Sequence, residues 1–470
     1  MITSDELQVR LAELAATTFV PGAAAAILYG EETVSAVTGT ANMKTGAPVV
    51  ADTLFASGSI CKVFTSSLIM TLVDDGAVEL DAPVQRYLPD FTLADPVKSA
   101  GVTVRMLLSH TSGLPGTYFP DDPAGPDAIE KFMRRLEAVP FPGTPGRQWS
   151  YSNPGMVTLG RIAEVVTKQA YDDALEQRIL RPLGLNATTY SDRMIMGSTA
   201  VGHLADPATG TVVPAPLFRK YYGNAPAGST LWLDVAALIG LARLHLDGGL
   251  GPDGRRVLSA ESVAAMRTPQ ADIWGGFPYP RWGLGWGIVD AGDHRLVAHG
   301  GGNIGMHSAL WVLPDHHAAV AVLTNGNTGT GLHMALSAEI LEREFGVELP
   351  APPSAPEVPE SVDPSLYVGR YGSVEGTFAV TCGADGGLYV VEEEWAPALA
   401  EASRLMGLVG GPREPTPLPM TCVDAKRSRF LVGMGPAGAP MASVPMEFYE
   451  ADSVGRPRLA RLSYLAERVG

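Results

Sequence analysis

The chain has 470 residues, of which 46% are hydrophobic and 18% are charged, a composition typical of a folded protein. This length exceeds the roughly 250–300 residues that one hydrophobic core usually serves, which favours two domains. The formal net charge of −16 opposes binding to nucleic-acid phosphates, and no basic stripe offsets it. We therefore expect no nucleic-acid partner.

The cysteines and the N-terminal segment bear on redox chemistry and location. Cys61, Cys382 and Cys422 form neither a disulfide framework nor a Cys-x-x-Cys zinc motif. The first seven residues are acidic where a signal peptide is basic, and no window approaches the ~20 apolar residues of a membrane helix. These patterns predict a soluble, cytoplasmic protein without a membrane partner, a metal or a cofactor.

The periodicity predicts a first body with strands near both of its ends. An amphipathic helix begins at Ser4, two strands follow at 23–29 and 33–39, and a buried helix runs from about Ser59 to Asp75. The middle, roughly 77–290, is mostly helical. Further strands at 285–290, 296–299, 308–313 and 318–323 and a helix at 332–345 complete it. Strands that are distant in the sequence can share one sheet only if the helical middle is an insertion between them that packs outside the sheet. This is an α+β arrangement.

The composition changes after this body. A proline cluster at 349–362 predicts a semi-rigid linker. Short alternating runs separated by Gly, Pro and Asp turns then predict a small all-β domain, either a sandwich or a barrel. Its four runs are 377–381, 387–391, 429–432 and 446–449. The predicted division is therefore a main domain at 1–348, the linker at 349–362 and the all-β domain at 363–470.

A serine and a lysine three residues apart open the predicted buried helix. Ser59 and Lys62 then lie on one helix face, about one turn apart. Free N–H groups and the helix dipole at this end favour negative charge on the serine. Burial would lower the pKa of the lysine, which could then take the serine proton. The alternative is a helix-capping serine beside a solvated lysine, but the apolar residues around Lys62 argue against solvation.

Two further motifs follow. The first is Trp149-Ser-Tyr151-Ser-Asn153-Pro-Gly155, which offers a phenol and a carboxamide before a helix, although a simple turn with a helix cap would also explain it.

The second is His299-Gly300-Gly301-Gly302 at the end of a predicted strand. Its glycines let a substrate approach the backbone, or they simply form a flexible turn. The His-Gly-Gly-Gly motif of α/β-hydrolases is a rival interpretation. That fold also requires a Gly-x-Ser-x-Gly elbow, which this sequence lacks.

In this order and with these gaps, the three motifs resemble those of the serine β-lactamase and penicillin-binding-protein superfamily, closest to its class C-like branch. Three supporting segments resemble that branch as well, and the resemblance covers roughly residues 10–345. They are Leu107-Leu-Ser-His-Thr-Ser-Gly113, Asn224-Ala-Pro-Ala-Gly228 and Gly283-Leu-Gly-Trp-Gly287. The resemblance implies an antiparallel sheet flanked by helices, a helical lobe, and a C-terminal lipocalin-like domain.

The resemblance also implies roles for the motif residues. Ser59 would be the nucleophile that forms an acyl-enzyme, with Lys62 and Tyr151 as its acid and base. Asn153 would contact the substrate amide or Lys62. His299 would replace the lysine of many lactamases, with less positive charge at neutral pH. Gly300 and Gly301 would belong to the substrate-binding and oxyanion region, and the backbone N–H groups of Ser59 and Gly302 would form the oxyanion hole.

Several other residues have side chains that could be reactive or bind a metal, but each has a simpler structural explanation. Ser109-His110 belongs to a segment that is mainly structural in the superfamily, Cys61 most often packs in the core, and Pro314-Asp-His-His317 resembles a metal cluster at a hairpin turn. Six aromatic residues near the motifs would line a pocket or belong to the core. They are Tyr118, Phe119, Tyr221, Tyr222, Trp274 and Trp282.

The acyl chemistry leaves several functions open. The predicted cytoplasmic location and the C-terminal β domain favour a penicillin-binding-protein-type thioesterase, which releases and cyclises a nonribosomal peptide with a D-residue at the acyl position. Such a peptidyl or small-molecule substrate would be delivered by a carrier protein. The alternatives are an esterase or D-amino-acid-specific peptidase or amidase, a small-molecule acyltransferase, and a non-catalytic recognition scaffold.

Overall fold

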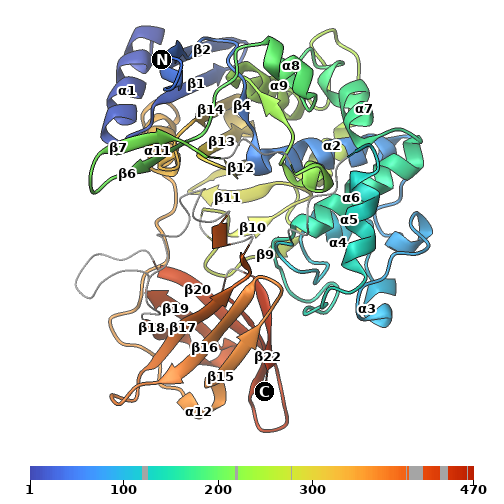
Figure 1. Cartoon of the computed structure of the whole chain (residues 1–470), viewed down its shortest axis with the longest axis vertical. Coiled ribbons are helices and arrows are strands. Elements are labelled where there is room, and N and C mark those ends of the chain that lie inside the picture. Colours follow the sequence, from blue (N-terminus) through green and yellow to red (C-terminus); the bar gives the residue numbers. More distant parts are fainter. Residues whose placement is uncertain are drawn as a thin grey trace.

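The protein is described by a computed structural model covering residues 1–118, 125–216, 221–276, 278–397, 400–401, 417–433, 443–462 and 464–469. Figure 1 shows a large body of sheet and helices above a smaller barrel that contains the C-terminal part of the chain. The predicted α+β fold with a small all-β C-terminal domain is confirmed, and the β domain is a barrel and not a sandwich.

An antiparallel sheet forms the centre of the body and joins segments from both of its ends. Among the described residues it has nine strands, in the order β3-β2-β1-β14-β13-β12-β11-β10-β9. Ala23 of β1 pairs with Thr324 of β14, so the first strand of the chain lies beside the last strand of the body. The strands are β1 (Gly22–Tyr29), β2 (Glu32–Asn42), β3 (Ala47–Pro48), β9 (Ala271–Asp272), β10 (Arg281–Trp282), β11 (Gly287–Ala291), β12 (His294–Asn303), β13 (Met306–Leu313) and β14 (Ala318–Thr324).

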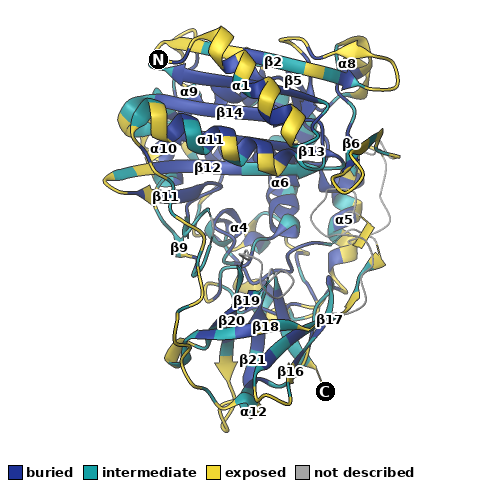
Figure 2. Ribbon diagram, turned by 90° about the vertical axis from the view of Figure 1, so that its left-hand side faces the viewer, coloured by how far each residue is buried: buried dark blue, intermediate teal, exposed yellow. Residues whose placement is uncertain are grey.

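Two helices cover one face of this sheet. They are α1 (Ser4–Thr17) and α11 (Gly329–Phe345), and Figure 2 shows both with buried inner and exposed outer sides. The side chain of Thr3 and the side chain of Glu6 form a capping box that starts α1. Leu7 and Leu11 of α1 and Leu336 of α11 are fully buried in one cluster with sheet residues such as Trp311. Alternating strand residues thus give this face a core of its own.

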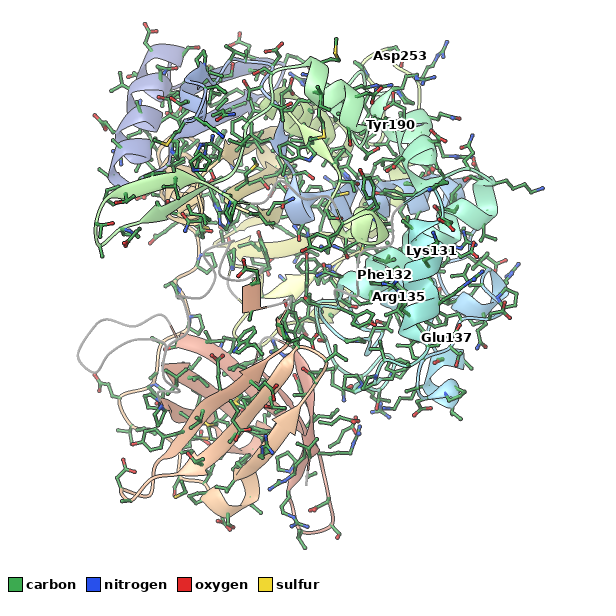
Figure 3. All side chains as sticks on the ribbon, in the orientation of Figure 1. Lys131, Phe132, Arg135, Glu137, Tyr190 and Asp253 are labelled. Carbon is green, nitrogen blue, oxygen red and sulfur yellow. The ribbon has the colours of Figure 1, made fainter. Side chains whose placement is uncertain are left out.

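The helical lobe packs on the other side. Its central helix, α2 (Cys61–Asp74), is buried at every residue from Cys61 to Leu72, as the apolar sequence predicts. A single hydrophobic cluster joins α2 to the sheet and to the surrounding helices. Those helices include α4 (Val104–Leu108), α5 (Ala128–Leu136), α6 (Asn153–Thr167), α7 (Tyr171–Leu175), α9 (Val235–Leu246) and α10 (Ala260–Met266). Phe132 of α5 is labelled in Figure 3, and its ring centroid lies 5.9 Å from that of Tyr118.

The C-terminal domain is a closed antiparallel barrel around an aromatic core. Within the described residues it has eight strands, four more than the sequence predicts. Closure removes the free edges that an open sheet of this size would expose. Tyr371, Phe430 and Phe448 are among the buried core residues. The strands are β15 (Gly369–Gly372), β16 (Gly376–Cys382), β17 (Leu388–Trp395), β18 (Leu418–Asp424), β19 (Arg429–Gly433), β20 (Ser443–Ala451), β21 (Pro457–Arg461) and β22 (Leu465–Val469).

None of the helices in the described residues combines the length and the apolar character that crossing a membrane requires.

Candidate active site

The predicted nucleophile and its lysine lie at the start of α2. Ser59 is in a 3₁₀ turn, Gly58–Ile60, and the α-helix proper begins at Cys61, two residues later than expected. Lys62 occupies the first turn of α2 with its side chain fully buried. Its Nζ donates to Ser59 Oγ at 2.9 Å and to the carbonyl oxygen of Ala227 at 2.6 Å. The Ser-x-x-Lys pair is therefore a direct hydrogen-bonded contact.

The buried position of Lys62 changes its acidity. Desolvation lowers the pKa of the ammonium from 10.5 to about 7, because the charged form loses its water. Near neutral pH a large fraction of Lys62 is therefore a neutral amine. A neutral amine within hydrogen-bond distance of a serine hydroxyl can act as a general base. The environment of Lys62 suits it to take the Ser59 proton.

Tyr151 is held beside this pair by aromatic packing. It precedes α6, whose start is fixed by Ser152, the side chain of which accepts from Gly155 N–H at 3.0 Å. Lys62 Nζ lies 4.9 Å from the centroid of the Tyr151 ring. Burial raises the pKa of the Tyr151 phenol well above 10, although a hydrogen bond with Ser59 opposes this. Tyr151 is thus a protonated phenol placed to donate to a leaving group.

His110 supports Tyr151 and does not reach the nucleophile through any hydrogen bond among the described residues. Its ring centroid lies 4.5 Å from that of Tyr151 and 5.1 Å from that of Trp282. Its Nδ1 accepts from the backbone N–H of Ser152 at 3.2 Å. Burial, and then the charge of Lys62, lower the pKa of His110, so the imidazole is neutral. This arrangement agrees with a structural role for the Ser109-His110 segment.

Asn153 lies at the first position of α6, next to Tyr151. Its backbone N–H donates to the Gly116 carbonyl at 2.7 Å, and its side-chain amide donates to Thr117 Oγ1 at 3.2 Å. Within the described part of the chain Asn153 makes no hydrogen bond to Lys62, so that alternative is not seen. Its contact with a substrate amide stays a prediction.

The glycine run lies within a strand, contrary to the expected strand end at His299. Strand β12 continues to Asn303, with Gly301 paired with Ser308 of β13. A Cβ on Gly301 would lie 2.1 Å from the Ser57 carbonyl oxygen. Gly58 has φ +53°, and a Cβ there would lie 2.5 Å from the Gly302 nitrogen. The glycines therefore let β12 approach the turn that carries Ser59 and bring the Gly302 nitrogen to the predicted oxyanion site.

His299 presents a buried lone pair and no cation. Its Nδ1 lies 2.6 Å from the Gly300 carbonyl oxygen, which can only accept, so Nδ1 carries the proton. Its Nε2 is buried and has no hydrogen-bond partner among the described residues. Burial, and then the charge of Lys62, lower the pKa of His299 to about 3. His299 is thus neutral at physiological pH, with Nε2 as an acceptor.

Sequence reasoning missed the residues that act through their backbone. The Ala227 carbonyl that anchors Lys62 and the adjacent Gly228 lie in the Asn224–Gly228 segment, to which no role was assigned. A Cβ on Gly228, at φ +120°, would lie 2.1 Å from the Gly58 carbonyl oxygen. The resemblance of this segment to the superfamily is the only signal that could have pointed to it. Contacts made by backbone groups do not depend on the side chain, so the residue types in the sequence do not reveal them.

The other candidate residues have structural surroundings. Cys61 Sγ lies 3.6 Å from both Tyr171 Oη and the Ala225 carbonyl, and burial raises the pKa of the thiol to about 11. His317 Nε2 lies 2.8 Å from Asp247 at the β13–β14 turn. Within the described residues no group of three or more His, Cys, Asp or Glu is arranged to hold a metal ion.

The six aromatic residues divide between core, site and surface. Trp282 is buried against Tyr151 and His299, with ring centroids 5.8 Å and 5.4 Å away. Trp274 lies against Arg429 of the barrel, whose guanidinium carbon is 5.4 Å from the ring centroid. Tyr118 packs in the lobe, Tyr221 is partly buried and Tyr222 is exposed, while Phe119 lies outside the described residues. Of the five that lie in the described part of the chain, Trp282 is the one whose ring packs against the motif residues.

Several known proteins are similar to this chain in sequence or in structure. The β-lactamase family model matches residues 9–344. Penicillin-binding protein 4 of Amycolatopsis lactamdurans is 36% identical over 356 residues, which cover 75% of this chain and 93% of that protein. The structure of SurE covers 99% of both chains with a TM-score of 0.81 and 25% identity. A D-amino acid amidase from Ochrobactrum anthropi SV3 covers 72% of this chain and 98% of its own, with a TM-score of 0.58 and 26% identity.

The family match and the 36% identical relative each extend over most of the catalytic body. Members of this family are serine hydrolases or acyltransferases, which agrees with the hydrogen-bonded Ser59–Lys62 pair. The chain belongs to the β-lactamase and penicillin-binding-protein family of serine enzymes.

Proposed function

We propose that the chain is a peptidyl thioesterase that releases a nonribosomal peptide and closes it head to tail. Ser59 Oγ would attack the thioester carbonyl while Lys62 takes its proton, and the thiol would leave with a proton from Tyr151. The N-terminal amine of the bound peptide would then attack the acyl-Ser59 carbonyl. Its proton would return through Tyr151 and Lys62 to Ser59 Oγ as the amide forms, which balances the cycle.

The neutral His299 is the observation that carries this proposal. A lysine at this position would offer a cation to the free carboxylate of a β-lactam or of a peptide acid. His299 instead offers a lone pair, with its only proton committed to Gly300 at 2.6 Å. A lone pair favours N–H donors such as an amide or an amine, and it leaves a carboxylate without a partner. A thioester donor with an amine acceptor brings no carboxylate to this point.

Two similarities support a D-residue at the acyl position. SurE, which matches this chain over its whole length including the barrel, has also been solved with D-Leu. The amidase that matches the catalytic body acts on D-amino acids according to its name. In the proposed reaction the donor would arrive as a thioester on a carrier protein, and the barrel would help to exclude water during aminolysis.

The test compares linear peptidyl thioesters that end in a D- or an L-residue, each made from a simple alkyl thiol. With a free N-terminus and a D-residue at the acyl position, we expect cyclic peptide as the main product by mass spectrometry. The same peptide with an acetylated N-terminus is the matched control and should give only linear acid. If the free-amine substrate also gives only linear acid, the enzyme is a hydrolase and not a cyclase.

The second candidate is an amidase or esterase that acts on D-amino acid derivatives. The D-amino acid amidase favours it, because that enzyme aligns with the catalytic body over 98% of its own chain. Faster turnover of D-amino acid amides than of D-ended thioesters would support this alternative.

His299→Lys should shift the preference toward donors that carry a free carboxylate. A charge-assisted hydrogen bond contributes about 1.5–3 kcal/mol, so we expect the kcat/KM ratio of benzylpenicillin to its methyl ester to rise at least tenfold. The ratio is measured at pH 7 for the wild type, His299→Lys and the neutral control His299→Gln. An equal rise in the Gln variant would show that charge is not the cause.

A further inference from the structure

The barrel contacts the segment that leads to Tyr151. Glu450 of β20 accepts from Thr144 Oγ1 and from Gln148 Nε2, both at 2.9 Å. The guanidinium carbon of Arg461, at the end of β21, lies 5.8 Å from the centroid of the Trp149 ring. The contacted residues Thr144, Gln148 and Trp149 all lie within the seven residues that precede Tyr151. The barrel therefore packs against the catalytic loop and not on a remote surface of the body.

A second set of contacts covers Gly116 and Thr117. Glu375, from the turn between β15 and β16, accepts from Thr117 N–H at 2.7 Å. Tyr464, from the turn between β21 and β22, lies so close to Gly116 that a Cβ there would be 1.8 Å from its ring. The Tyr464 hydroxyl accepts from Thr117 Oγ1 at 3.1 Å. Two barrel turns thus hold the same two residues of the body.

Thr117 links these barrel residues to a catalytic motif. Its hydroxyl has one proton, which it donates to Tyr464, and it accepts from the Asn153 amide at 3.2 Å. The Gly116 carbonyl accepts from the Asn153 backbone N–H at 2.7 Å. Tyr464, Thr117 and Asn153 are therefore one directed chain of hydrogen bonds, and the orientation of each hydroxyl depends on the next partner.

Glu375 makes this junction sensitive to the docking of the barrel. Its side chain is 5% exposed, and its second carboxyl oxygen is buried without a partner among the described residues. Burial raises the pKa of this carboxyl, while hydrogen bonds from the Ser373 side chain and then from the backbone N–H of Thr117 oppose the rise. A buried carboxyl is costly unless its hydrogen bonds are kept, so the Thr117 backbone has one favoured position against it.

We propose that Tyr464 and Glu375 of the barrel are positioning residues of the acyl-transfer site, which act through Thr117 to fix the side chain of Asn153. Thr117 is the third member of this unit. The inference needs only the serine acyl-transfer chemistry of the family and goes beyond the cyclisation proposed above. It means that the catalytic motif around Tyr151 and Asn153 is complete only when the barrel is docked.

The test uses the full chain with Tyr464→Phe, which keeps the ring on Gly116 and loses only the hydroxyl. Tyr389→Phe is the matched control, because Tyr389 is a partly exposed barrel tyrosine whose hydroxyl donates to Asp385 at 2.6 Å. The readout is the kcat/KM for a peptidyl thioester divided by that for p-nitrophenyl acetate, which has no amide for Asn153 to bind. We expect this ratio to fall about fivefold in Tyr464→Phe and to stay at the wild-type value in Tyr389→Phe.

Further variants separate positioning from general destabilisation. Thr117→Val should lower the ratio at least as much as Tyr464→Phe, and Thr117→Ser should restore it. Glu375→Gln should also lower it, whereas Glu393→Gln on the barrel surface should not. In the double variant Tyr464→Phe with Asn153→Ala, the loss should equal that of Asn153→Ala alone, because both changes break the same chain.

Fully additive losses in the double variant, or equal ratios in Tyr464→Phe and Tyr389→Phe, would overturn the inference. The outcome is independent of cyclisation, because linear release also passes through the peptidyl acyl-enzyme. A wild type that gives only linear acid would contradict the proposed cyclase and leave this ratio test intact.

Discussion

Ser59→Ala should abolish the covalent acyl adduct and lower kcat by about 10⁴-fold or more, because the nucleophile acts as a unit with its base. The Ser59 hydroxyl accepts from Lys62 at 2.9 Å, and alanine offers no atom that could replace it. Intact-mass spectrometry after incubation with an activated ester or a peptidyl thioester measures the adduct. Peptide mapping of the wild-type adduct should place the acyl group on Ser59.

Ser67→Ala is the matched control for this experiment. Ser67 lies on the same helix, is fully buried and has no hydrogen-bond partner among the described residues. This variant should keep the adduct, because the Ser67 hydroxyl takes no part in the proposed proton transfers. An adduct that persists in Ser59→Ala would place the nucleophile elsewhere and contradict the assigned mechanism.

The acylation rate should rise with pH through about 7, because Lys62 must be neutral to take the Ser59 proton and burial lowers its pKa to about 7. Below that pH the ammonium form dominates and kcat/KM should fall about tenfold per pH unit. Lys62→Arg should remove this limb and lower acylation by about 10³-fold, since a guanidinium stays protonated. Single-turnover acylation between pH 5 and 9 measures both effects.

The same burial predicts that Lys62→Met stabilises the fold while it destroys the activity. The folded-state pKa is lower than that of the unfolded chain, so unfolding binds protons between about pH 7 and 10.5 and the free energy of unfolding rises with pH across this window. Below pH 7 the folded protein bears the full desolvation cost of the buried, charged lysine. Methionine removes it, and we expect a gain of about 2 kcal/mol or more at pH 7.

Chemical denaturation of the wild type, Lys62→Met and the surface control Lys168→Met measures this gain. The gain of Lys62→Met over the control should shrink as the pH approaches 10. A Lys62→Met protein that is less stable than the wild type at pH 7 would show that the hydrogen bonds to Ser59 and Ala227 outweigh the cost of desolvation.

Much of the fold could be predicted because apolar periodicity marks its buried elements. The alanine-rich β1 and the apolar α2 are buried nearly throughout, and both are evident as continuous apolar runs. The four barrel strands that were missed have weaker patterns. Strand β15 reads Gly-Arg-Tyr-Gly, and β21 begins with a proline, so neither resembles an alternating strand.

The motif residues of the candidate site could be predicted, but their supports could not. Their reactive side chains, at spacings that resemble the superfamily motifs, can be recognised in the sequence at Ser59, Lys62, Tyr151 and His299. The role of Ala227 depends on a carbonyl that every residue has. The strand was expected to end near His299, because the pairing of the following glycines with β13 leaves no local signal in the sequence. Tyr464 lies more than 300 residues from Asn153, and only the docking of two domains brings them together.

The pairing of β1 with β14 also dictates when this protein can fold. Ala23 finds its partner Thr324 only after the chain between them has been made, so a growing chain carries the alanine-rich β1–β2 hairpin with one open edge. Contacts of such long range slow folding, because loop closure must precede any gain from the pairing. Ser59 emerges early in synthesis, but the strand that supplies Gly302 follows some 240 residues later. A nascent chain that stalls before β14 should therefore remain a chaperone client without acylating activity.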